Sequence, residues 1–288
     1  MNLPSFILPY ARLIYIARYN NVTTFLILFF FIDTFNYDDP NQWYIDHPQC
    51  LGLKQSPISI YSHKVLCLDF NLPPIFFGYY DEYFENALNV HNKGHTAEFS
   101  IPQTIVGERP FITGGLLTEL YEAQAVHFHW GSAERKGSEH IINERRYDLE
   151  MHIVHRNINY ETLEEAREYE DGIAVLSVLF KSVKSSNVYY PGLNEIYDTL
   201  DDIVRFNSTS STQNSITLGS LLADINREDF FTYRGKEVFI DYLSRCSKIY
   251  KDYCCNVDGE FIKNNFRPIQ ALEYRDIYHR KPIIEYEF

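Results

Sequence analysis

Basic residues are scarce in this chain of 288 residues: 26 Lys and Arg stand against 39 Asp and Glu, giving a formal net charge of −13 at pH 7. Without a basic stripe, the sequence excludes nucleic acid as a partner. Cysteines are few as well. The five that occur show neither a CxxC nor a Cys/His finger spacing, which argues against a structural zinc knuckle. The helical HExxH motif of metallohydrolases is also absent.

Long apolar runs are lacking too. The run TFLILFFFI at 24–32 is too short to span a bilayer as a helix, so no transmembrane span is predicted. Arg12 and Arg18 precede it, which is typical of a secretory signal. We predict a signal peptide or disordered N-terminus at 1–34, one domain at 35–288, and secretion, with a cytoplasmic location as the alternative. A buried strand or a wrongly assigned start codon would also account for the run.

Strand patterns dominate the remainder of the chain. Apolar residues alternate at 121–130 and 145–156, while 171–180 is a continuous apolar run that suits a buried strand. Helical patterns are confined to 161–170 and 191–206. The sequence therefore predicts an α+β fold, mainly β, with a large twisted, mostly antiparallel central sheet and short flanking helices.

The stretch FNSTSSTQNS at 206–215 is predicted to be a surface loop because it is polar and of low complexity. It contains the glycosylation sequon Asn207-Ser208-Thr209, which agrees with secretion.

The chemistry-bearing pattern is His-x-His. On a strand, His127 and His129 project from the same face, because side chains repeat every two residues. By the same rule Glu150, His152 and Val154 share a face of the next strand. If the two strands pair, three imidazoles converge, which is the arrangement of a catalytic zinc site with an open fourth position.

Glu150 lies one step from His152, where a carboxylate would accept the second ring N–H and fix the tautomer of the ligand. The alternative interpretation is a set of core histidines that bind backbone carbonyls. Three imidazoles with a carboxylate beside them favour the metal.

These motifs resemble the α-class carbonic anhydrase signature, in which HFHWG is followed by a strand of the form E-x-H-x-V-H. Further blocks match in order, and the resemblance covers about 35–280: QSPISI (55–60), HNKGH (91–95), DGIAVL (171–176) and NNFRPIQ (264–270). The resemblance implies reversible hydration of carbon dioxide to bicarbonate and a proton by a monomer that holds Zn²⁺.

The resemblance also assigns roles by position. His127, His129 and His152 correspond to the zinc ligands, and His95 to the histidine that shuttles protons, for which an imidazole suits because it titrates near neutral pH. Glu139 corresponds to the carboxylate that orders hydrogen bonds at the zinc.

Other positions correspond to the walls and floor of the family's site. Val154 and Val175 match the apolar wall beside carbon dioxide, and Gln55 and Tyr37 match residues near the floor. His140 and His155 belong to the motif and are interpreted as structural.

Two departures from the family stand out. Ala125 replaces a glutamine that supports the first zinc ligand in many members, which would weaken metal binding somewhat. After TYRG (232–235) the chain also lacks the family's Ser-Leu-Thr-Thr-Pro-Pro-Cys segment, and with it the threonine that partners Glu139 and the usual disulfide partner of Cys50. Cys50 is then free or paired with Cys246, Cys254 or Cys255.

The missing segment leaves two explanations, an incomplete gene model or a divergent member of the family. The alternative function is a catalytically weak or inactive carbonic anhydrase-related binding module.

Overall fold

The computed structural model describes residues 15–19, 22–26, 37–67, 72–182, 191–213, 216–222, 225–235, 238–246, 254–256 and 258–281. The chain divides into two compact units, Met1–Phe35 and Asn36–Phe288. In the first unit, β1 (Tyr15–Tyr19) and β2 (Val22–Leu26) form an antiparallel hairpin. The start of the apolar run at 24–32 thus lies in a strand, and 27–32 lies outside the described residues. The signal peptide stays a prediction.

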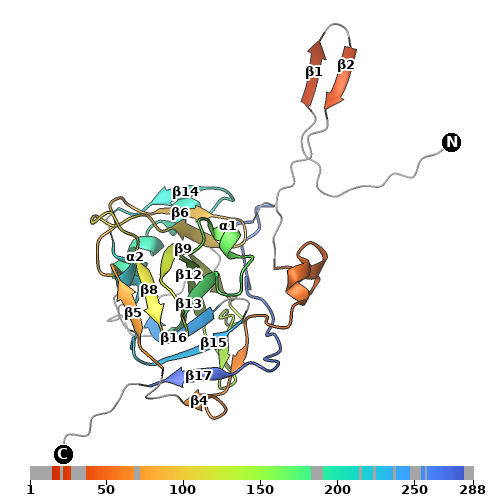
Figure 1. The fold of residues 1–288 in the computed structure, drawn as a ribbon. Coiled ribbons are helices and arrows are strands. Elements are labelled where there is room, and N and C mark those ends of the chain that lie inside the picture. Colours follow the sequence, from red (N-terminus) through yellow and green to blue (C-terminus); the bar gives the residue numbers. More distant parts are fainter. Residues whose placement is uncertain are drawn as a thin grey trace, which may run out of the picture. The chain divides into compact units, whose positions relative to one another are not determined.

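The second unit is built on one large sheet, which Figure 1 shows crossing the molecule with short helices at its margins. Its twelve strands are β4 (Leu66–Cys67), β5 (Ile75–Gly78), β6 (Asn89–Asn92), β7 (Ala97–Ser100), β8 (Phe111–Gly114), β9 (Tyr121–Trp130), β12 (Leu149–Asn157), β13 (Ile173–Ser182), β14 (Thr209–Ser211), β15 (Phe230–Arg234), β16 (Val238–Cys246) and β17 (Ile277–Arg280). The main path runs β14-β6-β7-β9-β12-β13-β16-β15-β17-β4, and β5 and β8 join it through β9.

Most neighbouring strands of this sheet are antiparallel, the exceptions being β13 with β16 and β17 with β4. A smaller sheet contains β3 (Ser59–Ile60), β10 (Ile141–Ile142) and β11 (Arg145–Arg146). The described helices are short: α1 (Leu163–Ala166), α2 (Pro191–Tyr197) and the 3₁₀ turns η1 (Pro40–Ile45), η2 (Pro48–Leu51), η3 (Leu200–Ile203) and η4 (Leu218–Leu222). The predicted fold class is confirmed.

The two predicted helices are shorter than their sequence patterns. In 161–170 only Leu163–Ala166 is helical, because the charged stretch offers little apolar surface and Ala166 is its one buried helical residue. The stretch 191–206 divides into α2 and η3. The prediction of a surface loop at 206–215 was wrong for Thr209–Ser211, which pairs with β6 as an edge strand, and residues 214 and 215 lie outside the described residues. Backbone pairing outweighs the low strand propensity expected of such a polar stretch.

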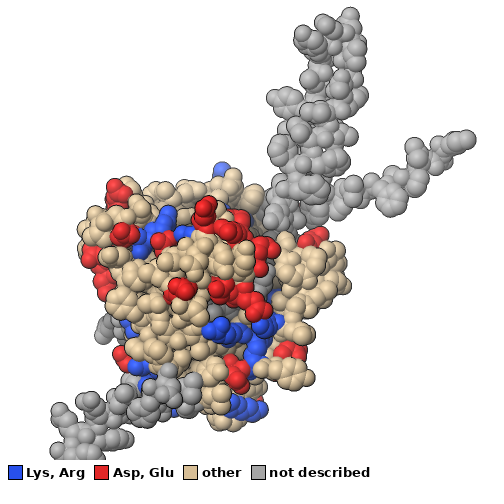
Figure 2. Space-filling view, in the orientation of Figure 1, with Lys and Arg blue, Asp and Glu red and all other residues tan. Residues whose placement is uncertain are grey.

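Acidic side chains gather in several separate groups on the face shown in Figure 2, and basic side chains lie among them. Among the described residues, no helix is both long enough and apolar enough to cross a membrane.

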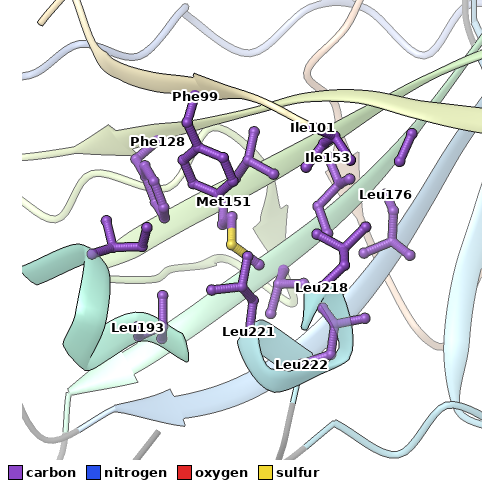
Figure 3. Close-up of a cluster of buried hydrophobic side chains, with 14 of the residues drawn as sticks. Phe99, Ile101, Phe128, Met151, Ile153, Leu176, Leu193, Leu218, Leu221 and Leu222 are labelled. Atoms are coloured by element: carbon purple, nitrogen blue, oxygen red, sulfur yellow. The ribbon is translucent and has the colours of Figure 1, made fainter. Parts of the chain in front are cut away.

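The main hydrophobic core lies on one face of the large sheet. Figure 3 shows Met151 at its centre, with Phe99 and Phe128 on one side and Leu221 on the other. These side chains come from β7, β9, β12 and η4, so the core joins the sheet to a 3₁₀ turn distant in sequence. Phe128 lies between His127 and His129 in the chain, and its burial here places the two histidines on the opposite face.

Truncation of Met151 should test this core. Met151 is fully buried, so Met151→Ala should lower the free energy of unfolding by about 2–5 kcal/mol, through lost apolar contact and an incompletely collapsed cavity. Urea unfolding followed by circular dichroism measures this. The matched control Phe76→Ala, at a side chain that is 60% exposed, should change stability by about 0.5 kcal/mol or less. Equal losses in the two variants would contradict the assignment of the core.

One histidine is part of the packed interior. His155 is fully buried, and its Nε2 lies 2.6 Å from the hydroxyl oxygen of Tyr80. Burial lowers the pKa of His155 from 6.5 to about 3, because the imidazolium would lose its hydration. Between these values the unfolded chain binds a proton that the folded chain does not.

The free energy of unfolding should therefore fall as the pH is lowered from 6.5 towards about 3, with His155 contributing about 1.4 kcal/mol per pH unit. Urea unfolding across this pH range measures the slope. In His155→Gln the side chain does not titrate. The slope of the free energy of unfolding against pH should therefore be shallower by the same amount, about 1.4 kcal/mol per pH unit. Identical slopes in the two proteins would show that His155 titrates alike in the folded and unfolded states.

Candidate metal centre

Register places the three predicted ligands side by side. β9 and β12 are antiparallel neighbours, with His127 opposite His152 and His129 opposite Glu150. Directly opposite residues project from the same face of a sheet, so all four side chains lie on the face away from the main core. One ring nitrogen from each histidine lies within 4.8 Å of the others. The structure thus brings together His127, His129 and His152, the three ligands that the sequence predicts.

Hydrogen bonds fix the tautomers of two of the rings. His129 Nδ1 lies 2.8 Å from the backbone carbonyl oxygen of Asn265, and His152 Nε2 lies 2.6 Å from Glu150 Oε1. A carbonyl and a carboxylate accept hydrogen bonds, so these two nitrogens carry the ring protons. The remaining nitrogens, His129 Nε2 and His152 Nδ1, each present a lone pair.

These two lone-pair nitrogens face each other at 3.2 Å. Two acceptors at that separation repel each other unless a cation lies between them. Zinc–nitrogen bonds of 2.0–2.1 Å in a tetrahedral site imply about 3.3 Å between ligand nitrogens. The donor set therefore fits a tetrahedral metal ion that His127, His129 and His152 would hold, with a fourth position left open.

Burial and neighbouring groups favour the neutral form of two of the rings, the form in which an imidazole binds a metal. Burial lowers the pKa of His127 well below 6.5, and the neighbouring His129, His152 and His95 lower it further. Burial also lowers the pKa of His129. Neutral imidazoles at neutral pH are ready to bind a metal without first losing a proton.

Glu150 is the most heavily hydrogen-bonded of the acidic groups described here. Its fully buried carboxylate accepts from His152 Nε2, from the ring (2.7 Å) and the backbone N–H (2.8 Å) of His140, and from the hydroxyl of Ser177 (2.8 Å). Burial alone would raise the pKa of Glu150. His140 and His152, through charge and hydrogen bonds, hold it well below its usual range.

The network continues beyond Glu150. His140 Nε2 lies 2.7 Å from the hydroxyl oxygen of Tyr233, which lies 2.9 Å from Ser56 Oγ. His140, Glu150 and His152 are themselves close enough to hold a metal ion. His140 and His152 each donate a ring N–H to Glu150, so the nitrogens that face this carboxylate carry protons and cannot bind a metal. We therefore interpret His140 and Glu150 as groups that orient His152 in the three-histidine site.

Glu139 lies at the margin of this centre. Its Oε1 accepts from the backbone N–H of Arg267 at 2.7 Å and lies 3.6 Å from His129 Nδ1. Burial raises the pKa of Glu139. In the part of the chain that the structure describes, no threonine or serine hydroxyl donates to it.

The absence of such a partner follows from the sheet. β16 begins three residues after Gly235 and pairs directly with β15, with Arg234 opposite Val238. Residues 236 and 237 lie outside the described residues. Cys50, Cys254 and Cys255 are free thiols, so Cys50 forms no disulfide with either of the other two.

The remaining predicted positions come from several separate elements of the second unit. Val154 and Val175 are directly opposite each other on β12 and β13 and belong to a second hydrophobic cluster. His95 is half-buried, and its backbone carbonyl oxygen accepts from Asn265 Nδ2 at 2.9 Å. The Tyr37 ring meets the His129 ring edge-on at 6.2 Å between centroids.

Gln55 binds Arg267, whose Nη1 donates to Gln55 Oε1 at 2.9 Å. Ala125, two residues before His127, brings no hydrogen-bonding side chain to that ligand.

Sequence reasoning missed Asn265. This fully buried residue supports His129 through its carbonyl oxygen and binds the backbone N–H of Trp130 through Oδ1 at 2.6 Å. It lies in the irregular stretch 264–270, which carries no strand or helix period. Only the match of the NNFRPIQ block could have drawn attention to it.

The family model and the individual relatives that match this chain all belong to the carbonic anhydrases. Residues 38–236 match the model of the eukaryotic-type carbonic anhydrases. Mouse carbonic anhydrase 15 is 35% identical over 155 residues, 54% of this chain and 47% of that protein. Mouse carbonic anhydrase 6 is 32% identical over 198 residues, 68% of this chain and 58% of its own length.

Bovine carbonic anhydrase 6 is 30% identical over 256 residues, 82% of this chain and 76% of that protein. The chain thus spans about half the length of the two mouse relatives. The family match ends at residue 236, where β15 passes into β16.

Removal of the Glu150 charge should weaken metal binding. In Glu150→Gln the partner of His152 Nε2 becomes a neutral amide, so affinity for a divalent ion such as Zn²⁺ should fall about 10- to 100-fold. Competition against a chromophoric chelator measures it, and circular dichroism checks folding. The exposed control Glu119→Gln should bind like the parent chain. Unchanged affinity in folded Glu150→Gln would remove the supporting role of this carboxylate.

Proposed function

This chain belongs to the eukaryotic-type carbonic anhydrase family, and on that premise we propose that it catalyses the zinc-dependent, reversible hydration of carbon dioxide to bicarbonate and a proton. The observation that carries the proposal is the convergence of three imidazoles on β9 and β12, with His129 Nε2 and His152 Nδ1 3.2 Å apart. His127, His129 and His152 would hold the ion. Zn²⁺ in such a site makes water acidic enough to act as a nucleophile near pH 7, as established for carbonic anhydrase.

The protein's own groups supply the remaining functions. Glu150 and Asn265 orient two ligand rings, so the geometry is set before the ion binds. Val154 and Val175 provide an apolar wall, which suits an uncharged substrate. His95 carries the released proton to solvent on its imidazole, a group whose charge changes near neutral pH.

Glu139 is the weak point of this proposal. The carboxylate accepts from the backbone N–H of Arg267, and among the described residues no threonine or serine hydroxyl donates to it. Loss of one preorganised hydrogen-bonding group costs an enzyme about 10²- to 10³-fold in rate. We therefore expect a turnover reduced by about this factor relative to family members that contain the threonine.

The same observation favours a second candidate, a carbonic anhydrase-related binding module that holds zinc without useful catalysis. Against it stands the complete set of three histidines. We further propose that the protein is monomeric and that it is secreted, and the apolar run at 24–32, with Arg12 and Arg18 before it, supports secretion.

Stopped-flow hydration of carbon dioxide, with zinc analysis of the same sample, tests the proposal. The parent chain should contain one zinc and exceed the buffer rate, lose activity to a strong chelator and regain it with added Zn²⁺. His152→Ala should lose both zinc and activity, whereas His63→Ala, at an exposed loop histidine, should keep both.

One bound zinc with no rate above buffer would overturn catalysis and select the binding module. A folded parent chain that binds no zinc would overturn both candidates.

A further inference from the structure

A surface turn between η3 and β14 carries an acceptor motif that the catalytic proposal does not use. Asn207, followed by Ser208 and Thr209, is exposed, and its backbone φ of 62° is in the left-handed region. Asparagine adopts that region far more readily than most residues. The turn is fixed by the backbone N–H of Asn207, which donates to the Asn92 carbonyl oxygen at 3.0 Å.

The side-chain amide of Asn207 is oriented by one contact. His91 Nε2 lies 2.9 Å from Asn207 Oδ1, so the ring donates and the amide oxygen accepts. No described group engages the amide nitrogen. The exposed side chain therefore presents Nδ2, the atom to which an N-linked sugar is attached, while Oδ1 binds His91.

Thr209, the third residue of the sequon, is exposed at the start of β14. β14 is the terminal strand of the main path, and among the described residues it pairs with β6 alone. An open edge of this kind offers unpaired backbone groups to other chains, and a bulky polar substituent beside it would hinder such pairing.

We propose that Asn207 is an N-glycosylation site whose glycan stands beside the open edge at β14. Nδ2 forms a bond to the anomeric carbon of an oligosaccharide. The bond from that carbon to the phosphate of a lipid-linked diphosphate donor breaks, the lipid diphosphate leaves with the electron pair, and Nδ2 loses one proton. This inference rests on the secretion part of the proposed function, because the transfer occurs in the secretory pathway.

The register also places this glycan relative to the metal centre. Thr209 is opposite His91, His91 opposite Glu98, and Glu98 opposite His127. Three strand spacings of about 4.8 Å put the turn roughly 14 Å from the nearest ligand strand. The glycan should therefore leave hydration of carbon dioxide unchanged.

The test is expression of the full chain behind a heterologous signal peptide in animal cells, with electrophoresis before and after treatment with a peptide N-glycosidase. The parent chain should shift, and the enzyme should convert Asn207 to Asp, which peptide mass analysis identifies. Asn207→Asp, which keeps the left-handed turn and the acceptor for His91, and Thr209→Ala should both lose this glycan. The control Ser208→Ala keeps the sequon and should retain it.

A second sequon, Asn21-Val22-Thr23, requires its own control. All comparisons are therefore repeated in an Asn21→Gln background, so that any remaining shift reports Asn207 alone. A secreted, folded parent chain with an unmodified Asn207 peptide would overturn the inference and leave zinc binding and catalysis untouched. Conversely, a glycosylated chain with no zinc or activity would overturn the catalytic proposal and leave this site in place.

Discussion

The candidate metal centre depends on one buried carboxylate, that of Glu150. Glu150 is removed from water, a costly position for a charge, and four donors compensate it. Two of those donors are imidazoles. The carboxylate therefore also determines which ring nitrogen of His152 carries no proton. The tautomer of this candidate ligand is thus coupled to the burial of the Glu150 charge.

The register of the sheet sets the positions of the polar side chains around Glu150. A row of directly opposed residues runs from Glu98 through His127 and His152 to Ser177, crossing four strands on one face. The opposite face is filled by the core around Met151. A slip of one residue between β9 and β12 would turn the histidines into the core and Phe128 towards solvent. The apolar packing on one face therefore specifies the geometry of the polar groups on the other.

Sequence alone predicted the fold class and the convergence of the three histidines, because a period of two residues and a His-x-His spacing are local signals. It could not predict how Asn265 supports His129, since that contact joins an irregular stretch to a strand 136 residues earlier. It also overestimated the helices at 161–170 and 191–206, where tertiary packing limits α1 and α2 to four and seven residues. The strand β14 was missed because its partner, not its composition, makes it a strand.

The direct hairpin between β15 and β16 bears on how this architecture tolerates loss. β16 pairs with β13, and β15 pairs with both β16 and β17, although only two residues separate β16 from Gly235. In the strand order, β13 separates this hairpin from β9 and β12, the two strands that carry the candidate ligands. Because loops between strands tolerate changes of length better than the strands do, a change of length at this hairpin should leave the pairing of β9 with β12, and so the convergence of the three imidazoles, in place.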